Sequence, residues 1–227
     1  MPTKLPGLFD SFDNLDAISI DSLILWLKEA GVSIPPFQLE NYLANKILYP
    51  QTLPLTDIDM KIDLAILRQA LTINGPKSSK NTANPLLGDN PFLNITLRKI
   101  IIPERFLYFV PDLVSLTWAF VDGLLLVDRQ KEDWYEDLWT VILADDIDQI
   151  IGSVILPQFS GKSDSMDLFL QDRNFKIRAG NLTVVPCDKE RCQIRYKLLN
   201  GKILGKNESS LEVYGGKLGL MIDGRIV

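Results

Sequence analysis

The hydrophobic pattern of the chain changes near Pro157, and this change constrains the fold more than any other feature of the sequence. Before it, apolar residues recur at helical spacing or in longer strand-like segments. After it, short runs of alternating and β-branched residues follow one another between turn residues, which is typical of an all-β module. The sequence therefore predicts a helical and α/β part over residues 1–156 and an all-β module over residues 157–227.

The first third of the chain predicts helices. Apolar residues at helical spacing mark three of them, over residues 18–31, 36–48 and 56–74. Thr56 and Asp59 have the spacing of a capping box, in which each side chain reaches a free backbone N–H of the other residue. Residues 48–55, bounded by prolines, predict an extended linker, and residues 74–91, rich in Asn, Pro, Ser and Gly, predict an exposed loop.

The middle of the chain alternates between strand-like and helix-like segments. A β-branched run over residues 94–102 predicts a strand, residues 112–126 a helix, and residues 138–145 an apolar strand. Residues 146–155 predict a further short helix that Asp145 or Asp146 caps. This alternation predicts an α/β layer.

The C-terminal end carries a pair of glycines between two strand-like runs, over residues 210–214 and 217–223. Gly215 and Gly216 allow a tight reversal, so this segment predicts a hairpin. A phosphate cradle is disfavoured, because the glycines lead into a strand and lack the GxxxxGK[ST] pattern. Asp223 and Arg225, two residues apart near the end, either pair with a neighbour or face solvent.

Composition excludes several kinds of chemistry. The 227 residues contain no histidine, so a Ser-His-Asp triad, a Cys-His pair and an imidazole metal ligand are all excluded. Cys187 and Cys192 are the only cysteines and are too few for a Cys-rich zinc site. Their spacing fits a hairpin disulfide, but no secretory segment is recognised, so we expect two reduced thiols in a cytoplasmic protein. No apolar run is long enough to cross a membrane.

Three groups of charged residues are candidate sites. Asp145, Asp146 and Asp148 could hold Mg²⁺, but helix capping explains the same residues without a ligand and is favoured. The acidic segment 128–137, with Trp134 and Tyr135, is either a partner-binding surface or, as we favour, a solvated loop. Arg98, Lys99 and Arg105 are too few for a nucleic-acid patch, and the net charge of −5 also disfavours one. No catalytic, cofactor-binding or metal-binding residue is therefore assigned.

Three segments, in this order, resemble the glutamate mutase accessory proteins of the MutL type, a family of large actin-like proteins. The first is a proline-bounded run leading into a long helix, the second a DGL segment followed by a strand, and the third a C-terminal β module. The residues that carry the resemblance are Asn45, Leu48, Pro50, Gln51, Pro54, Asp122, Gly123, Leu124, Asp145, Gly152, Gly180, Pro186, Gly215, Gly216, Gly219, Leu220, Ile222, Asp223 and Arg225. The resemblance spans about residues 25–225. It implies a partial actin-like (ribonuclease H-like) layer.

The functional implication of the resemblance depends on one turn. Family members contain an ATPase core that is thought to maintain or reactivate adenosylcobalamin-dependent glutamate mutase, and a glycine-rich turn follows the strand that corresponds to residues 94–102. Here that turn is Pro103–Phe106, and no glycine occurs between Gly88 and Gly123. Side chains in this turn would keep the backbone away from a nucleotide. The phosphate-gripping hairpins of the family's N-terminal half also have no counterpart.

The resemblance therefore implies a non-catalytic interaction or chaperone-like module with no cofactor of its own. Its expected partner is a protein, either the missing ATPase half or a subunit of a cobalamin-dependent mutase. Two alternatives stay open. The chain could be half of an ATPase that binds ATP and Mg²⁺ once a partner completes the site, or a structural assembly protein that has retained only the fold.

Overall fold

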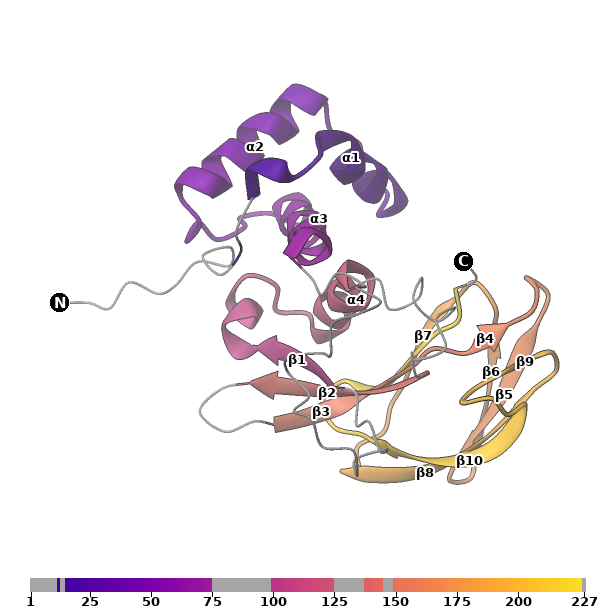
Figure 1. Cartoon of the computed structure of the whole chain (residues 1–227). Helices are drawn as coiled ribbons and strands as arrows, with labels where there is room; N and C mark the ends of the chain where they lie inside the picture. Colours follow the sequence, from indigo (N-terminus) through magenta and orange to yellow (C-terminus); the bar gives the residue numbers. More distant parts are fainter. Residues whose placement is uncertain (1–11, 13–14, 75–98, 125–136, 145–148, 226–227) are drawn as a thin grey trace, which may run out of the picture.

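The computed structural model describes residues 12, 15–74, 99–124, 137–144 and 149–225, and they form three layers (Figure 1). Helices cover one face of a central mixed sheet, and a second, antiparallel sheet lies on its other face. Two hydrophobic cores follow from this order. One lies between the helices and the central sheet, and the other lies between the two sheets.

Four α-helices form the first layer. They are α1 (Ile20–Glu29), α2 (Pro36–Leu48), α3 (Asp57–Asn74) and α4 (Leu113–Gly123), with short 3₁₀ turns at Leu15–Ala17 and Glu104–Tyr108. The capping box before α3 is confirmed, because the Asp59 N–H donates to Thr56 Oγ1 (3.1 Å) and the Thr56 N–H donates to Asp59 Oδ2 (3.0 Å). Asp112 caps α4 by accepting from the N–H groups of Val114 and Ser115.

The central sheet has the strand order β1-β2-β3-β11-β7. Its strands are β1 (Lys99–Pro103), β2 (Leu138–Ala144), β3 (Gln149–Ile155), β7 (Leu182–Val185) and β11 (Gly219–Asp223). The β1–β2 and β3–β11 pairs are parallel, whereas β2–β3 and β11–β7 are antiparallel. Strands from both sides of residue 157 thus build one sheet, while the domain boundary at that residue stays a prediction.

The short helix predicted over residues 146–155 is wrong, because β3 occupies Gln149–Ile155 and pairs with β2. The reason is burial on both faces: Ile151 and Val154 belong to the core under the helices, and Ile155 to the core between the sheets. A strand buried on both faces has no alternation, so its apolar run cannot be distinguished from a buried helix by periodicity. Asp145 and Asp146, the predicted caps, lie outside the described residues.

The second sheet has the order β10-β8-β5-β6, and all its pairs are antiparallel, as the sequence after Pro157 predicts. Its strands are β5 (Ser165–Leu170), β6 (Arg173–Arg178), β8 (Arg191–Leu198) and β10 (Glu208–Tyr214), and a two-stranded pair, β4 (Gln158–Phe159) and β9 (Gly201–Lys202), lies beside them. Along β8 exposed and buried residues alternate strictly. One face of this sheet therefore packs in the core and the other faces solvent.

The hairpin predicted at Gly215 and Gly216 is wrong. The strand before the glycines, β10, belongs to the second sheet, and the strand after them, β11, lies between β3 and β7 in the central sheet. A Cβ atom on Gly215 would overlap the carbonyl oxygens of Cys187 and Lys189, and Gly216 has φ = 130°, which other residues rarely adopt. The glycines let the chain cross from one sheet to the other under the 187–192 turn.

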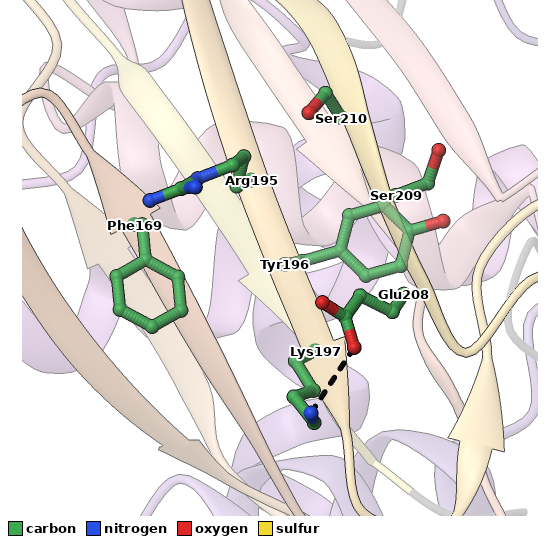
Figure 2. A pocket seen from close by; sticks show the side chains of 7 residues that line it. All are labelled: Phe169, Arg195, Tyr196, Lys197, Glu208, Ser209 and Ser210. Atoms are coloured by element: carbon green, nitrogen blue, oxygen red, sulfur yellow. Dashed lines mark ion pairs between the residues drawn. The ribbon is translucent and has the colours of Figure 1, made fainter.

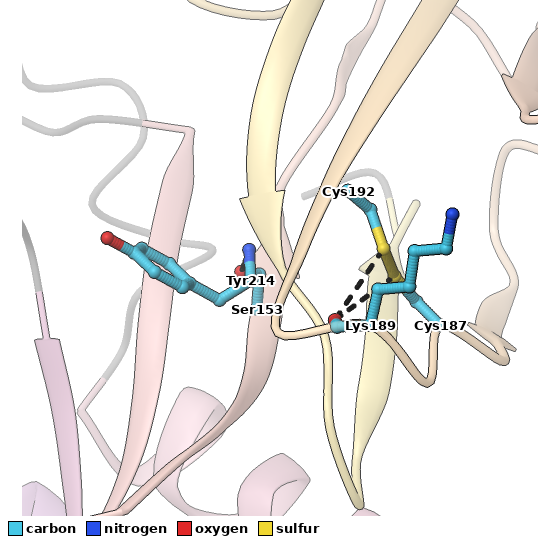
Figure 3. Close-up of a disulfide and its surroundings, with 5 residues drawn as sticks. All are labelled: Ser153, Cys187, Lys189, Cys192 and Tyr214. Carbon is cyan, nitrogen blue, oxygen red and sulfur yellow. Dashed lines mark hydrogen bonds between the residues drawn. A yellow bond between two sulfur atoms is a disulfide. The ribbon is translucent and has the colours of Figure 1, made fainter.

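The prediction of two reduced thiols is also wrong, because Cys187 and Cys192 form a disulfide (Figure 3). β7 ends just before Cys187 and β8 begins at Arg191, so the turn between the two sheets brings the sulfurs together. Both cysteines are buried, with 4% and 5% of their surface exposed. Near the disulfide, the backbone N–H of Tyr214 donates to Ser153 Oγ (2.9 Å), which fixes β10 to β3.

Replacing both cysteines with alanine is expected to lower the free energy of unfolding by roughly 2 kcal/mol, since the disulfide closes a short loop whose entropy is released in the unfolded chain. Urea unfolding with and without dithiothreitol measures this loss. The double variant is the control and should not respond to the reductant. If the reductant leaves the wild-type midpoint unchanged, the disulfide does not contribute to stability.

Candidate functional site

Large apolar side chains gather on the surface at the loop that joins α2 to α3. Over residues 47–58 six of them are exposed, namely Ile47 (41%), Leu48 (69%), Tyr49 (57%), Leu53 (51%), Leu55 (90%) and Ile58 (51%). We call this set the α2–α3 loop surface. Single exposed apolar residues are normal, whereas six of them within twelve residues of chain make this segment a candidate interaction site.

A buried network of polar side chains lies directly under this surface. Lys46 Nζ is 2.7 Å from Asp63 Oδ2, and the Tyr42 hydroxyl donates to Asp63 Oδ1 at 2.9 Å. Tyr42 and Lys46 are one turn apart on α2 and face the same carboxylate on α3. The Lys46 and Asp63 side chains are only 4% and 0% exposed, so the ion pair is excluded from water.

The network also holds the loop. Lys46 Nζ donates to the carbonyl of Thr52 (2.6 Å), and the Tyr42 hydroxyl lies 3.3 Å from the carbonyl of Asp59. Thr52 Oγ1 in turn donates to the carbonyl of Tyr49 (2.8 Å). The loop backbone is thus held by the buried Lys46 at Thr52 and by the Thr52 hydroxyl at Tyr49. Such preorganisation lowers the entropy lost when a partner binds.

The electrostatics of the network favour a structural role for it. Burial raises the pKa of the Asp63 carboxyl, and the hydrogen bond and charge of Lys46 oppose that rise. Burial and the neighbouring Asp63 raise the pKa of Tyr42, so its hydroxyl stays protonated and remains a donor. A lysine, a carboxylate and a phenol could exchange protons, but a carboxylate with no exposed surface has no access to a substrate.

A second buried cluster joins α4 to the end of β11. The Arg225 guanidinium pairs with Asp223 through Nε (2.8 Å) and with Asp122 through Nη2 (2.5 Å). Asp122 and Asp223 have side chains that are 5% and 0% exposed. Of the two possibilities left open by the sequence, Asp223 and Arg225 therefore pair, with each other and with a helix 103 positions away in the chain.

Arginines and tryptophans extend this cluster across the helical layer. Arg68 of α3 lies 3.9 Å from Asp122 and stacks over the Trp26 ring of α1. The Trp26 and Trp118 ring centroids are 5.7 Å apart, and the Arg225 guanidinium lies 5.4 Å from the centre of the Trp118 ring. Burial by itself would lower the pKa of Arg225, but hydrogen bonds to Asp223 and Asp122 raise it above its ordinary value.

The turn after β1 is filled by side chains. A 3₁₀ turn follows Pro103, and Phe106 within it is only 2% exposed. Its ring packs against Phe120 of α4 (centroids 5.9 Å apart) and against Phe12 (6.4 Å). The turn after β1 is thus occupied by a buried, tightly packed aromatic side chain.

Most of the charged candidate sites predicted from the sequence fall outside the described residues. These are Arg98, the segment 128–136 with Trp134 and Tyr135, and Asp145, Asp146 and Asp148. Lys99 is exposed on β1, and Arg105 lies 5.5 Å from the Phe106 ring. Within the described ranges, no three Asp, Glu or Cys residues are close enough together to hold a metal ion, and no helix is long and apolar enough to span a membrane.

The sequence reasoning missed both buried clusters. The only signal for the first was the one-turn spacing of Tyr42 and Lys46, which surface residues often share. For the second, the i, i+2 spacing of Asp223 and Arg225 is a local signal, but nothing nearby in the sequence points to Asp122 or to the tryptophans.

Comparison of the chain with protein-family models, with curated proteins and with solved structures gives no significant match.

Proposed function

We propose that this chain is a non-catalytic interaction or chaperone-like module, related to the glutamate mutase accessory proteins, that binds a protein partner through the α2–α3 loop surface. The partner is either an actin-like ATPase half or a subunit of a cobalamin-dependent mutase. The observation that carries the proposal is the group of exposed apolar side chains over residues 47–58, held in place by the buried Lys46–Asp63 pair. An actin-like ancestry of the central layer is part of the proposal.

The resemblance supports the same surface. Its first motif contains Leu48, the last residue of α2, and Pro50, Gln51 and Pro54 in the loop that follows, so all four lie within the α2–α3 loop surface segment 47–58. Prolines restrict the backbone of such a segment, so they add to the constraint that the buried network imposes.

Binding measurements test this proposal. We expect Leu48→Ser/Leu55→Ser to weaken the partner's affinity at least about tenfold, because each exposed leucine loses its apolar contact with the partner. The probes are purified glutamate mutase subunits and an actin-like ATPase domain of an accessory protein, and calorimetry reads out the Kd. Leu199→Ser is the matched control, since Leu199 is equally apolar and 74% exposed but lies after β8. Failure of the wild-type chain to bind any of these probes would contradict the proposal, as would equal losses in test and control.

A thermal shift with ATP and Mg²⁺ separates the proposal from the ATPase-half alternative. We expect the unfolding midpoint to move by less than about 1 °C, since a ligand that does not bind the native state does not stabilise it. We expect no binding because the packed side chain of Phe106 occupies the turn after β1. A clear upward shift for this chain alone would favour the ATPase half.

A further inference from the structure

The outer face of the second sheet carries basic side chains in a regular pattern. Along β8 the exposed residues are Arg191, Gln193, Arg195 and Lys197, while the residues between them are buried. The strand register places Arg195 beside Ser210 of β10 and Phe169 of β5, and it places Lys197 beside Glu208 and Asp167.

A shallow groove of about 410 Å³ lies on this face (Figure 2). Its lining consists of Phe169, Arg195, Tyr196, Lys197, Glu208, Ser209 and Ser210. On the outer face of β10 the small Ser210, which lies opposite Arg195, leaves room that a longer side chain would fill. The groove is therefore open to solvent and bordered by Arg195 and Lys197.

Both cations at the groove are available to a ligand. The Arg195 guanidinium lies 5.4 Å from the centre of the Phe169 ring, and stacking of this kind leaves the N–H groups at its edge accessible. No ion pair with a carboxylate is found for Arg195 among the described residues. Lys197 pairs with Glu208 at 3.1 Å, but both side chains are more than 60% exposed, so the pair is weak and exchangeable.

We propose that this groove binds a short acidic segment of a partner protein in an extended conformation. Side chains two residues apart on a strand project from the same face about 7 Å apart, so Arg195 and Lys197 have the spacing of two carboxylates at positions i and i+2 of an extended peptide. The Arg195 guanidinium can bind one carboxylate in a bidentate manner, and the Ser210 hydroxyl can donate beside it.

The carboxylates on the same face favour a peptide over a nucleic acid. Asp167, Glu208 and Glu212 alternate with the basic residues, so a continuous row of phosphates would meet them. A short segment with spaced carboxylates can instead place one beside Arg195, which has no carboxylate opposite it in the strand register. The strands β8 and β10, which carry most of the groove's lining, lie on the side of the molecule opposite α2 (Figure 1), so the groove is distinct from the α2–α3 loop surface and its occupancy does not depend on the proposed function.

Titration with a synthetic peptide of four Glu-Ser repeats, followed by ¹H–¹⁵N NMR of the whole chain, tests the proposal. We expect shifts of the Arg195, Lys197 and Ser210 amides, a Kd that rises at least about fivefold in Arg195→Gln, and weaker binding at higher salt. A peptide of four Gln-Ser repeats is the matched ligand control. Arg173→Gln is the matched protein control, because Arg173 is exposed on β6 but lies on the other face, opposite the buried Leu170.

Three outcomes would overturn the proposal. The first is equal affinity for the two peptides, and the second is an equal loss of affinity for the acidic peptide in Arg195→Gln and Arg173→Gln. The third is tighter binding of an oligothymidylate than of the acidic peptide at the groove. The last result would assign the face to single-stranded nucleic acid. Arg195→Gln should keep the wild-type unfolding midpoint, because it removes only an exposed side chain.

Discussion

Asp63→Ala is expected to lower the free energy of unfolding by about 3–5 kcal/mol, the largest loss we expect from a single substitution in the helical layer. The variant leaves the Lys46 ammonium, whose side chain is 4% exposed, without its carboxylate, and it removes the acceptor of the Tyr42 hydroxyl. A buried charge without a partner loses its hydration and gains nothing in return. Urea unfolding followed by circular dichroism measures the loss.

The double variant Lys46→Met/Asp63→Leu is the control for this prediction. It removes both charges and fills the space with apolar groups, so we expect it to lose much less stability than Asp63→Ala. A double-mutant cycle over the two positions then gives the coupling energy between them. If Asp63→Ala costs less than about 1 kcal/mol, or if the double variant loses as much as the single one, the pair does not hold α2 and α3 together.

Arg225→Met is expected to lower the free energy of unfolding by about 3 kcal/mol at neutral pH. Arg225 is the shared partner of Asp122 and Asp223, and without it two buried carboxylates face each other. The end of β11 would also lose its ionic contact with α4. Arg225→Lys is the matched control. It keeps the charge but not the fork of donors, so we expect a smaller loss of stability.

The loss in Arg225→Met should depend on pH in a defined direction. In the wild-type protein burial already raises the pKa of Asp122, and Arg225 opposes this rise. Without Arg225 the folded-state pKa rises further, so the folded protein binds protons more tightly than the unfolded chain and its relative stability increases as pH falls. The deficit should be greatest at neutral pH and above, and it should shrink as pH falls through the raised pKa towards the ordinary value of about 4. A deficit that grows on acidification would show that the Asp122 carboxylate does not cause it.

The helices and the caps at Thr56 and Asp59 were predictable because they depend on residues within one or two turns of each other. The strand β3 was not, since burial on both faces removes the alternation that identifies a strand. The partner of β11 was not predictable either. A pair of glycines permits a hairpin and a crossing between sheets equally well, and local sequence does not distinguish them.

The sequence by itself determined the helices α1 to α4 and the change to short strands after Pro157, and by its lack of histidine it excluded imidazole chemistry. Only the tertiary structure decided that Lys46 is buried under an exposed apolar loop, and that Asp122 meets Arg225 across more than a hundred residues. The physical reason is the separation along the chain over which each kind of interaction acts. Helix periodicity and capping act between near neighbours in the chain, whereas burial of a charge depends on which distant elements pack around it.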